Sequence, residues 1–161
     1  MLLSEEEVYN GAKRWLRKNG YIVLAGQPAR GVDHLPVIEI KQPTGDKGSK
    51  FAYKPDLVAF KDNKFYIIEC KPGFDKGDLL KVTEVLNSPE RLYSFYNELE
   101  QYQLLRKINY TGGYNAFCTS VVGILAHSEK GLPCSLQQLK IEDWKGKAIL
   151  IPSNTATSSV Q

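Results

Sequence analysis

Two acidic residues and a lysine near the middle of the sequence have types and a spacing that could do chemistry. Asp56 follows a proline and precedes a short apolar run, whereas Glu69 and Lys71 come directly after a second apolar run. Between the runs stand Asp62 and Asn63, which readily adopt the backbone angles of a tight turn. The pattern predicts a β-hairpin with charged side chains at its open end.

Counting outwards from a two-residue turn determines which residues of the hairpin face each other. The numbers of facing residues then have a constant sum, so Asp56 falls opposite Glu69. Because side chains alternate between the two faces of a strand, Lys71 projects from the same face as both carboxylates, and Lys54 falls opposite Lys71. Carboxylates that face each other have Cβ atoms about 5 Å apart and repel unless a cation compensates their charge.

The compensating charge has two candidate sources. Lys54 and Lys71 could supply part of it. Paired Asp and Glu oxygens also suit Mg²⁺, a hard ion that retains several waters and takes one or two carboxylates. The backbone carbonyl of Cys70 could complete the protein side of such a site. This interpretation depends on turn length, because a three-residue turn would shift the register by one and put Asp56 and Glu69 on different faces.

The order Pro55-Asp56 followed by Glu69-Cys70-Lys71 resembles the signature of the PD-(D/E)xK nuclease superfamily, which has the restriction-endonuclease-like fold. The resemblance implies that Asp56 and Glu69 hold Mg²⁺, or Mn²⁺ as a substitute, and that Lys71 orients or helps to deprotonate an attacking water. The expected reaction is hydrolysis of phosphodiester bonds in DNA. Restriction, homing, junction-resolving and repair enzymes share this core, and the motif does not distinguish among them.

Many members of the superfamily also use a glutamate from the first helix, and the resemblance makes Glu5 a candidate third ligand of the ion. Glu5 shares a helix face with the apolar residue Val8. Glu6 is the next candidate, whereas Glu7 is better explained as the capping-box partner of Ser4.

Basic side chains near the motif are candidates for contact with a nucleic-acid backbone. They are His34, Lys54, Lys76 and Lys81. A solvated surface explains such lysines equally well, and a histidine in a loop is more often without a catalytic part. Cys70 alternates to the face opposite Glu69, which predicts a core residue packed against a helix.

The remaining sequence predicts the elements that would position the hairpin. Expected helices lie at 4–20, 79–86, 88–108 and 134–140, and expected strands at 21–25, 36–40, 51–60, 64–71, 114–127 and 147–152. The fold class is therefore mixed α/β (α+β) with one central mixed sheet. The order of helix, three strands, helix and strand matches the core that the resemblance implies.

Length and composition set the broad class. A chain of 161 residues fits one domain, expected over 1–152 and followed by a flexible tail at 153–161. The net charge of +3 permits a nucleic-acid partner without requiring one. The three cysteines are widely spaced and predict neither a disulfide framework nor a zinc knuckle. An acidic N-terminus and the short apolar runs predict a cytoplasmic protein without a membrane span.

Two alternatives stay open beside a nuclease. A nuclease-fold protein could bind nucleic acid or a partner protein without cutting, although the intact Asp, Glu and Lys set argues against this. An unrelated small α/β scaffold could carry the motif by accident, and in that case Asp56 and Glu69 would not share a face. Small members of the superfamily often pair, so a homodimer is compatible with the resemblance.

Overall fold

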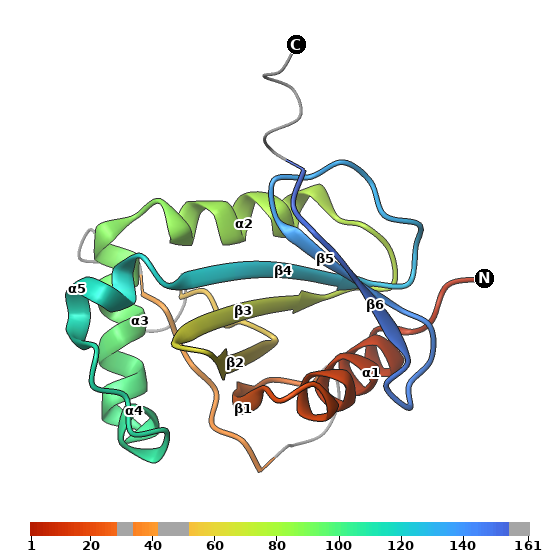
Figure 1. Cartoon of the computed structure of the whole chain (residues 1–161). Helices are drawn as coiled ribbons and strands as arrows, with labels where there is room; N and C mark the ends of the chain where they lie inside the picture. Colours follow the sequence, from red (N-terminus) through yellow and green to blue (C-terminus); the bar gives the residue numbers. More distant parts are fainter. Residues whose placement is uncertain (29–33, 42–51, 155–161) are drawn as a thin grey trace.

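A mixed six-stranded open sheet forms the centre of the computed structural model, which describes residues 1–28, 34–41 and 52–154 (Figure 1). The strands lie side by side in the order of the chain: β1 (Ile22–Gly26), β2 (Leu57–Lys61), β3 (Lys64–Cys70), β4 (Val121–His127), β5 (Gln137–Ile141) and β6 (Ala148–Ile151). Neighbouring strands are antiparallel except for β3 with β4 and β4 with β5. The expectation of mixed α and β structure around one central mixed sheet is confirmed.

Five helices in the described residues cover the sheet in two unequal layers. They are α1 (Glu5–Lys18), α2 (Lys76–Leu86), α3 (Pro89–Gln101), α4 (Leu104–Lys107) and α5 (Gly113–Cys118). The apolar stripe of α1 packs against one face of the sheet, and the other four helices contribute to the core on the opposite face. Helix α1 begins with the predicted capping box, in which the Ser4 and Glu7 side chains each accept the other residue's backbone N–H.

The β2–β3 hairpin has the register that the sequence predicts. Lys61 faces Lys64 and Leu57 faces Ile68. The predicted alternation is also present, because Ile67 lies in the core under α2 whereas Cys70 lies in the core under α1. The prediction that Cys70 is a core residue packed against a helix is confirmed.

One expected strand is absent and another is shorter than predicted. Residues 36–40 do not form a strand, and only Ile40 pairs, in an isolated antiparallel bridge with Tyr53. The strand expected at 51–60 is β2, which begins only after Pro55. Proline has no N–H to donate and cannot extend a ladder of hydrogen bonds through this point.

Later parts of the chain need three further corrections. The helix expected at 88–108 is divided into α3 and α4, because Gln103 has a φ of 59° in the left-handed region. The next expected strand begins as α5, and only its second half forms β4. Residues 134–140, expected as a helix, instead contribute to β5, in which Leu139 and Ile141 alternate with polar residues. In so short a stretch the helical and strand periods both fit.

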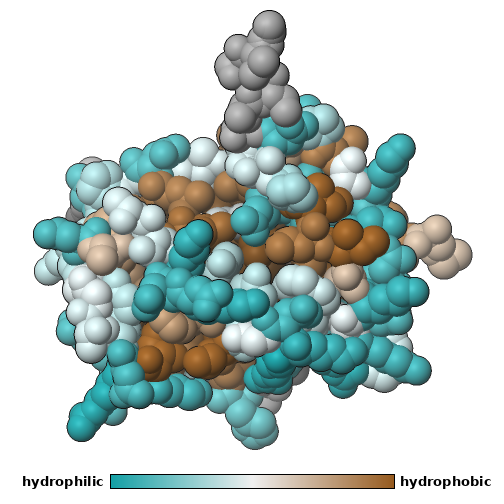
Figure 2. All heavy atoms as spheres, viewed as in Figure 1, coloured by the Kyte–Doolittle hydropathy of each residue, from teal (hydrophilic) through white to brown (hydrophobic). Residues whose placement is uncertain are grey.

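The layer around α2 leaves part of the sheet uncovered. Helix α2 packs on β4, and Figure 2 shows apolar side chains in a band between α2 and the end of the sheet formed by β5 and β6. Ile149 of β6 is 56% exposed. Within the part of the chain that the structure describes, no helix is both long and apolar enough to cross a membrane. Most of the tail expected at 153–161 lies outside the described residues.

Candidate functional site

The open end of the β2–β3 hairpin brings Asp56 and Glu69 together. At the closed end, Asp62 and Asn63 have φ angles of 51° and 64°, as a tight two-residue hairpin turn requires. The regular pairing continues to Leu57 opposite Ile68, so the next residues outward are Asp56 and Glu69. The turn therefore sets the register that makes the two carboxylates neighbours.

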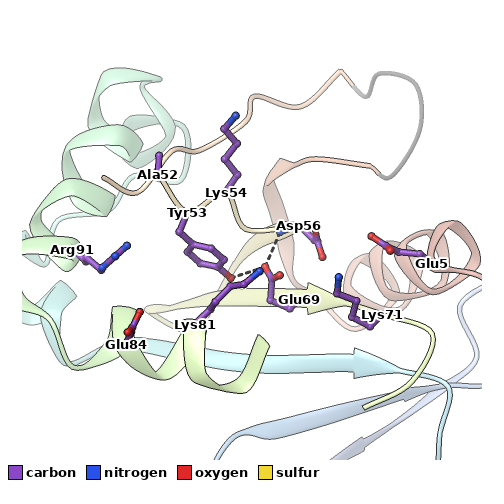
Figure 3. A pocket seen from close by; sticks show the side chains of 10 residues that line it. All are labelled: Glu5, Ala52, Tyr53, Lys54, Asp56, Glu69, Lys71, Lys81, Glu84 and Arg91. Carbon is purple, nitrogen blue, oxygen red and sulfur yellow. Dashed lines mark hydrogen bonds between the residues drawn. The ribbon is translucent and has the colours of Figure 1, made fainter. Parts of the chain in front are cut away.

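Backbone hydrogen bonds hold one oxygen of each carboxylate. The Asp56 N–H donates to Glu69 Oε2 at 3.2 Å, and the Cys70 N–H donates to Asp56 Oδ2 at 2.8 Å. The Tyr53 hydroxyl also donates to Glu69 Oε2, at 2.5 Å (Figure 3). Among the described residues, Asp56 Oδ1 and Glu69 Oε1 have no hydrogen-bond donor. Each carboxylate thus keeps one oxygen for another partner.

Burial disfavours the charged form of both carboxylates. Glu69 is only 5% exposed, and burial together with the negative charge of Asp56 raises the pKa of Glu69 to about 8. Burial also raises the pKa of Asp56 to about 6, although the hydrogen bond from the Cys70 N–H opposes the rise. The raised pKa values show that nearby positive charge only partly offsets the cost of burying these two carboxylates.

Lys71 carries its charge beside this pair. Burial alone would lower the pKa of Lys71, but the carboxylates of Asp78, Glu5, Asp75 and Asp56 raise it above its ordinary value. Figure 3 shows the Glu5 carboxylate, on α1, facing the side chains of Asp56 and Lys71. At neutral pH the lysine is therefore a cation among acids.

These side chains line one pocket of about 360 Å³. Its lining residues are Glu5, Ala52, Tyr53, Lys54, Asp56, Glu69, Lys71, Lys81, Glu84 and Arg91. Glu5 and Lys71 lie at one end, whereas Arg91 and Glu84 lie at the other (Figure 3). The pocket thus combines acidic and basic groups along its length, as a site for a cation and a phosphate would.

Most of the residues singled out from the sequence reach this pocket, and a few do not. Asp56, Glu69 and Lys71 line it together with Glu5, Lys54 and Lys81. His34 and Lys76 are exposed and are not among its lining residues. Glu6 is also exposed, and Glu7 is occupied in the capping box. Within the described residues, no group of three or more His, Cys, Asp or Glu side chains is arranged to hold a metal ion.

Sequence reasoning missed Tyr53 and Asp78. Asp78, in the first turn of α2, is 3% exposed, and its Oδ2 has no hydrogen-bond partner in the described part of the chain. Its Oδ1 lies 3.6 Å from Nζ of Lys81. Burial raises the pKa of Asp78 as well. Neither residue belongs to a motif, so only the packing of α2 and of the segment before Asp56 identifies them.

Comparisons of the chain with protein-family models, curated proteins and solved structures found no match. The functional interpretation therefore depends on the geometry of the pocket and on the resemblance of the motif.

Proposed function

We propose that this chain is a metal-dependent endonuclease of the PD-(D/E)xK superfamily that hydrolyses phosphodiester bonds of DNA. The observation that carries the proposal is that Asp56, Glu69 and Lys71 line one pocket from the open end of a single hairpin. The order of α1, three strands, helices and β4 agrees with a restriction-endonuclease-like core. Strands β5 and β6 would then be additions that extend the sheet.

The chemistry of the carboxylates fits a divalent cation. Glu69 is buried and Asp56 is half-buried beside it, both have raised pKa values, and each has an oxygen without a donor among the described residues. Asp56 and Glu69 would hold Mg²⁺ or Mn²⁺, with Glu5 and the Cys70 carbonyl as further candidates. Mg²⁺ needs only a small number of protein ligands, because it keeps several waters in its coordination shell. When bound, the cation would lower the pKa of a water molecule and neutralise negative charge on the phosphate.

The basic residues of the pocket have complementary tasks. Lys71 lines the pocket beside both carboxylates, where it would donate hydrogen bonds, stabilise negative charge at the phosphate and orient the attacking water. Lys54, Lys81 and Arg91 line the same pocket and would contact further phosphates of the DNA backbone.

The test is cleavage of plasmid DNA with Mg²⁺ or Mn²⁺, compared between the wild type and Asp56→Asn, Glu69→Gln and Lys71→Ala. Each change should lower the cleavage rate by about 100-fold to 1,000-fold, since each removes a group that acts on the developing charge. Glu100→Gln, on the exposed side of α3, is the matched control and should cleave normally.

Normal cleavage by Glu69→Gln would exclude this assignment. Salt-sensitive DNA binding without any cation-stimulated cleavage would instead favour a protein of this fold that binds without cutting.

A further inference from the structure

Tyr53 makes a contact with Glu69 that the motif does not include. The Tyr53 side chain is 9% exposed, and its hydroxyl donates to Glu69 Oε2 at 2.5 Å. The same oxygen accepts the Asp56 N–H at 3.2 Å. Glu69 Oε2 therefore has two donors, whereas Glu69 Oε1 has none among the described residues.

The position of Tyr53 is itself fixed by backbone contacts. Tyr53 and Ile40 form an isolated antiparallel bridge, in which each N–H donates to the other residue's carbonyl at 2.8 Å. The adjacent Glu39 N–H donates to Oε1 of Glu98, a buried carboxylate on α3, at 3.0 Å. Helix α3 thus fixes the segment around Ile40, and this segment in turn fixes Tyr53 through the bridge.

The Tyr53 hydroxyl is placed to donate to the Glu69 carboxylate. An ionised carboxylate can only accept hydrogen bonds, so the phenol O–H is the donor in this contact. A donor fixed by the surrounding structure restricts the rotation of the Glu69 carboxylate.

We propose that Tyr53 is a positioning residue of the cation site: by holding Oε2 of Glu69 it leaves Oε1 directed to the bound Mg²⁺ or Mn²⁺. The inference rests on the proposed function and extends it to a residue outside the motif. Groups that hydrogen-bond to metal ligands commonly change metal affinity by about 10-fold to 100-fold when they are removed.

The experiment measures Mn²⁺ binding by calorimetry in the wild type, Tyr53→Phe and Tyr110→Phe, with Glu69→Gln as the variant that lacks the ligand. Tyr110→Phe is the matched control, because the Tyr110 hydroxyl donates to the Gly113 carbonyl at 3.1 Å and its ring packs at the opposite end of β3. Tyr53→Phe should weaken Mn²⁺ binding by about 10-fold to 100-fold, and Tyr110→Phe should leave it unchanged.

Cleavage kinetics separate positioning from a general structural defect. Because Tyr53 acts through Glu69, the Tyr53→Phe protein should need more Mn²⁺ and then recover the wild-type rate at saturation. If wild-type binding is lost in Glu69→Gln and unchanged in Tyr53→Phe, this inference is overturned and the nuclease proposal stands. Equal weakening in Tyr110→Phe would also overturn the inference. A wild type that binds no Mn²⁺ would overturn both.

Discussion

The β2–β3 hairpin has a pair of ionisable side chains of the same kind at each end, and the surroundings of the two pairs differ. At the tip, Lys61 faces Lys64, which is exposed. Nζ of Lys61 donates to the Asn19 carbonyl at 2.7 Å. At the base, Asp56 and Glu69 lie in the pocket, and Glu69 is 5% exposed.

The difference shows that burial decides what such a pair costs. In water, two charges 4 Å apart interact with only about 1 kcal/mol, and the interaction grows several-fold as the effective dielectric constant falls. The lysines at the tip are near water, so their repulsion is small. Burial raises the pKa values of both carboxylates at the base. A bound cation would lower these pKa values again by stabilising the ionised forms.

The largest effect on stability is expected beside the tip, from Phe65→Ala. Phe65 is fully buried, and its ring lies 4.9 Å from those of Phe60 and Phe117 and 5.1 Å from that of Tyr110. Removing it should lower the free energy of unfolding by about 3–5 kcal/mol, because a cavity replaces these contacts. Urea unfolding measures the loss.

Leu80→Ala provides the control for Phe65→Ala, since Leu80 is 66% exposed. The free energy of unfolding of the Leu80→Ala protein should differ from that of the wild type by about 0.5 kcal/mol or less. A loss below about 1 kcal/mol in Phe65→Ala would contradict the view that the aromatic side chains near the tip carry much of the stability.

A smaller, pH-dependent gain in stability is expected at the base from Glu69→Gln in the metal-free protein. The folded pKa of Glu69 is about 8, above its unfolded value, so its contribution to stability is full below about pH 4 and is lost as the pH rises through the folded pKa. A neutral glutamine at this position has no such loss, and the variant should be more stable by about 1–3 kcal/mol at about pH 8.5.

Urea unfolding at about pH 4 and about pH 8.5 with a chelator checks this gain. The difference between Glu69→Gln and the wild type should shrink towards the lower pH. If the wild type were more stable than Glu69→Gln at the higher pH, ionisation of Glu69 would not be destabilising the folded protein.

The smallest effect is expected at the tip from Lys64→Glu. The change turns the exposed like-charge pair with Lys61 into an opposite-charge pair and should raise the free energy of unfolding by about 0.2–0.5 kcal/mol. Thermal unfolding at low salt and at about 1 M salt measures it, because salt should remove the gain. A gain that persists at high salt would show that it does not come from attraction between the exposed charges.

Features that depend on local chemistry could be predicted from the sequence. The Asp62-Asn63 turn fixes the hairpin register, and the register alone brings Asp56 and Glu69 together. The capping box of α1 follows equally from the side chain of Ser4. In each case the residues that determine the structure are close in the chain.

Features that depend on distant packing could not be predicted. Tyr53 reaches Glu69 because a bridge to Ile40 places it there, and this bridge is held in turn by contacts with α3. Asp78 is buried by the packing of α2 against the sheet. Residues 134–140 fit a helical period by themselves, and pairing with β4 makes residues 137–140 part of β5.

The short hairpin also governs the conformational entropy needed to assemble the site. Asp56 and Glu69 are separated by 13 positions, whereas the pairing of β3 with β4 joins Phe65 to the distant Val121. The entropy lost on closing a chain segment increases with its length, so bringing these two carboxylates together requires little loss. The entropy cost of bringing the two carboxylates together therefore falls on one local segment of the chain, separate from the cost of the long-range pairing of β3 with β4.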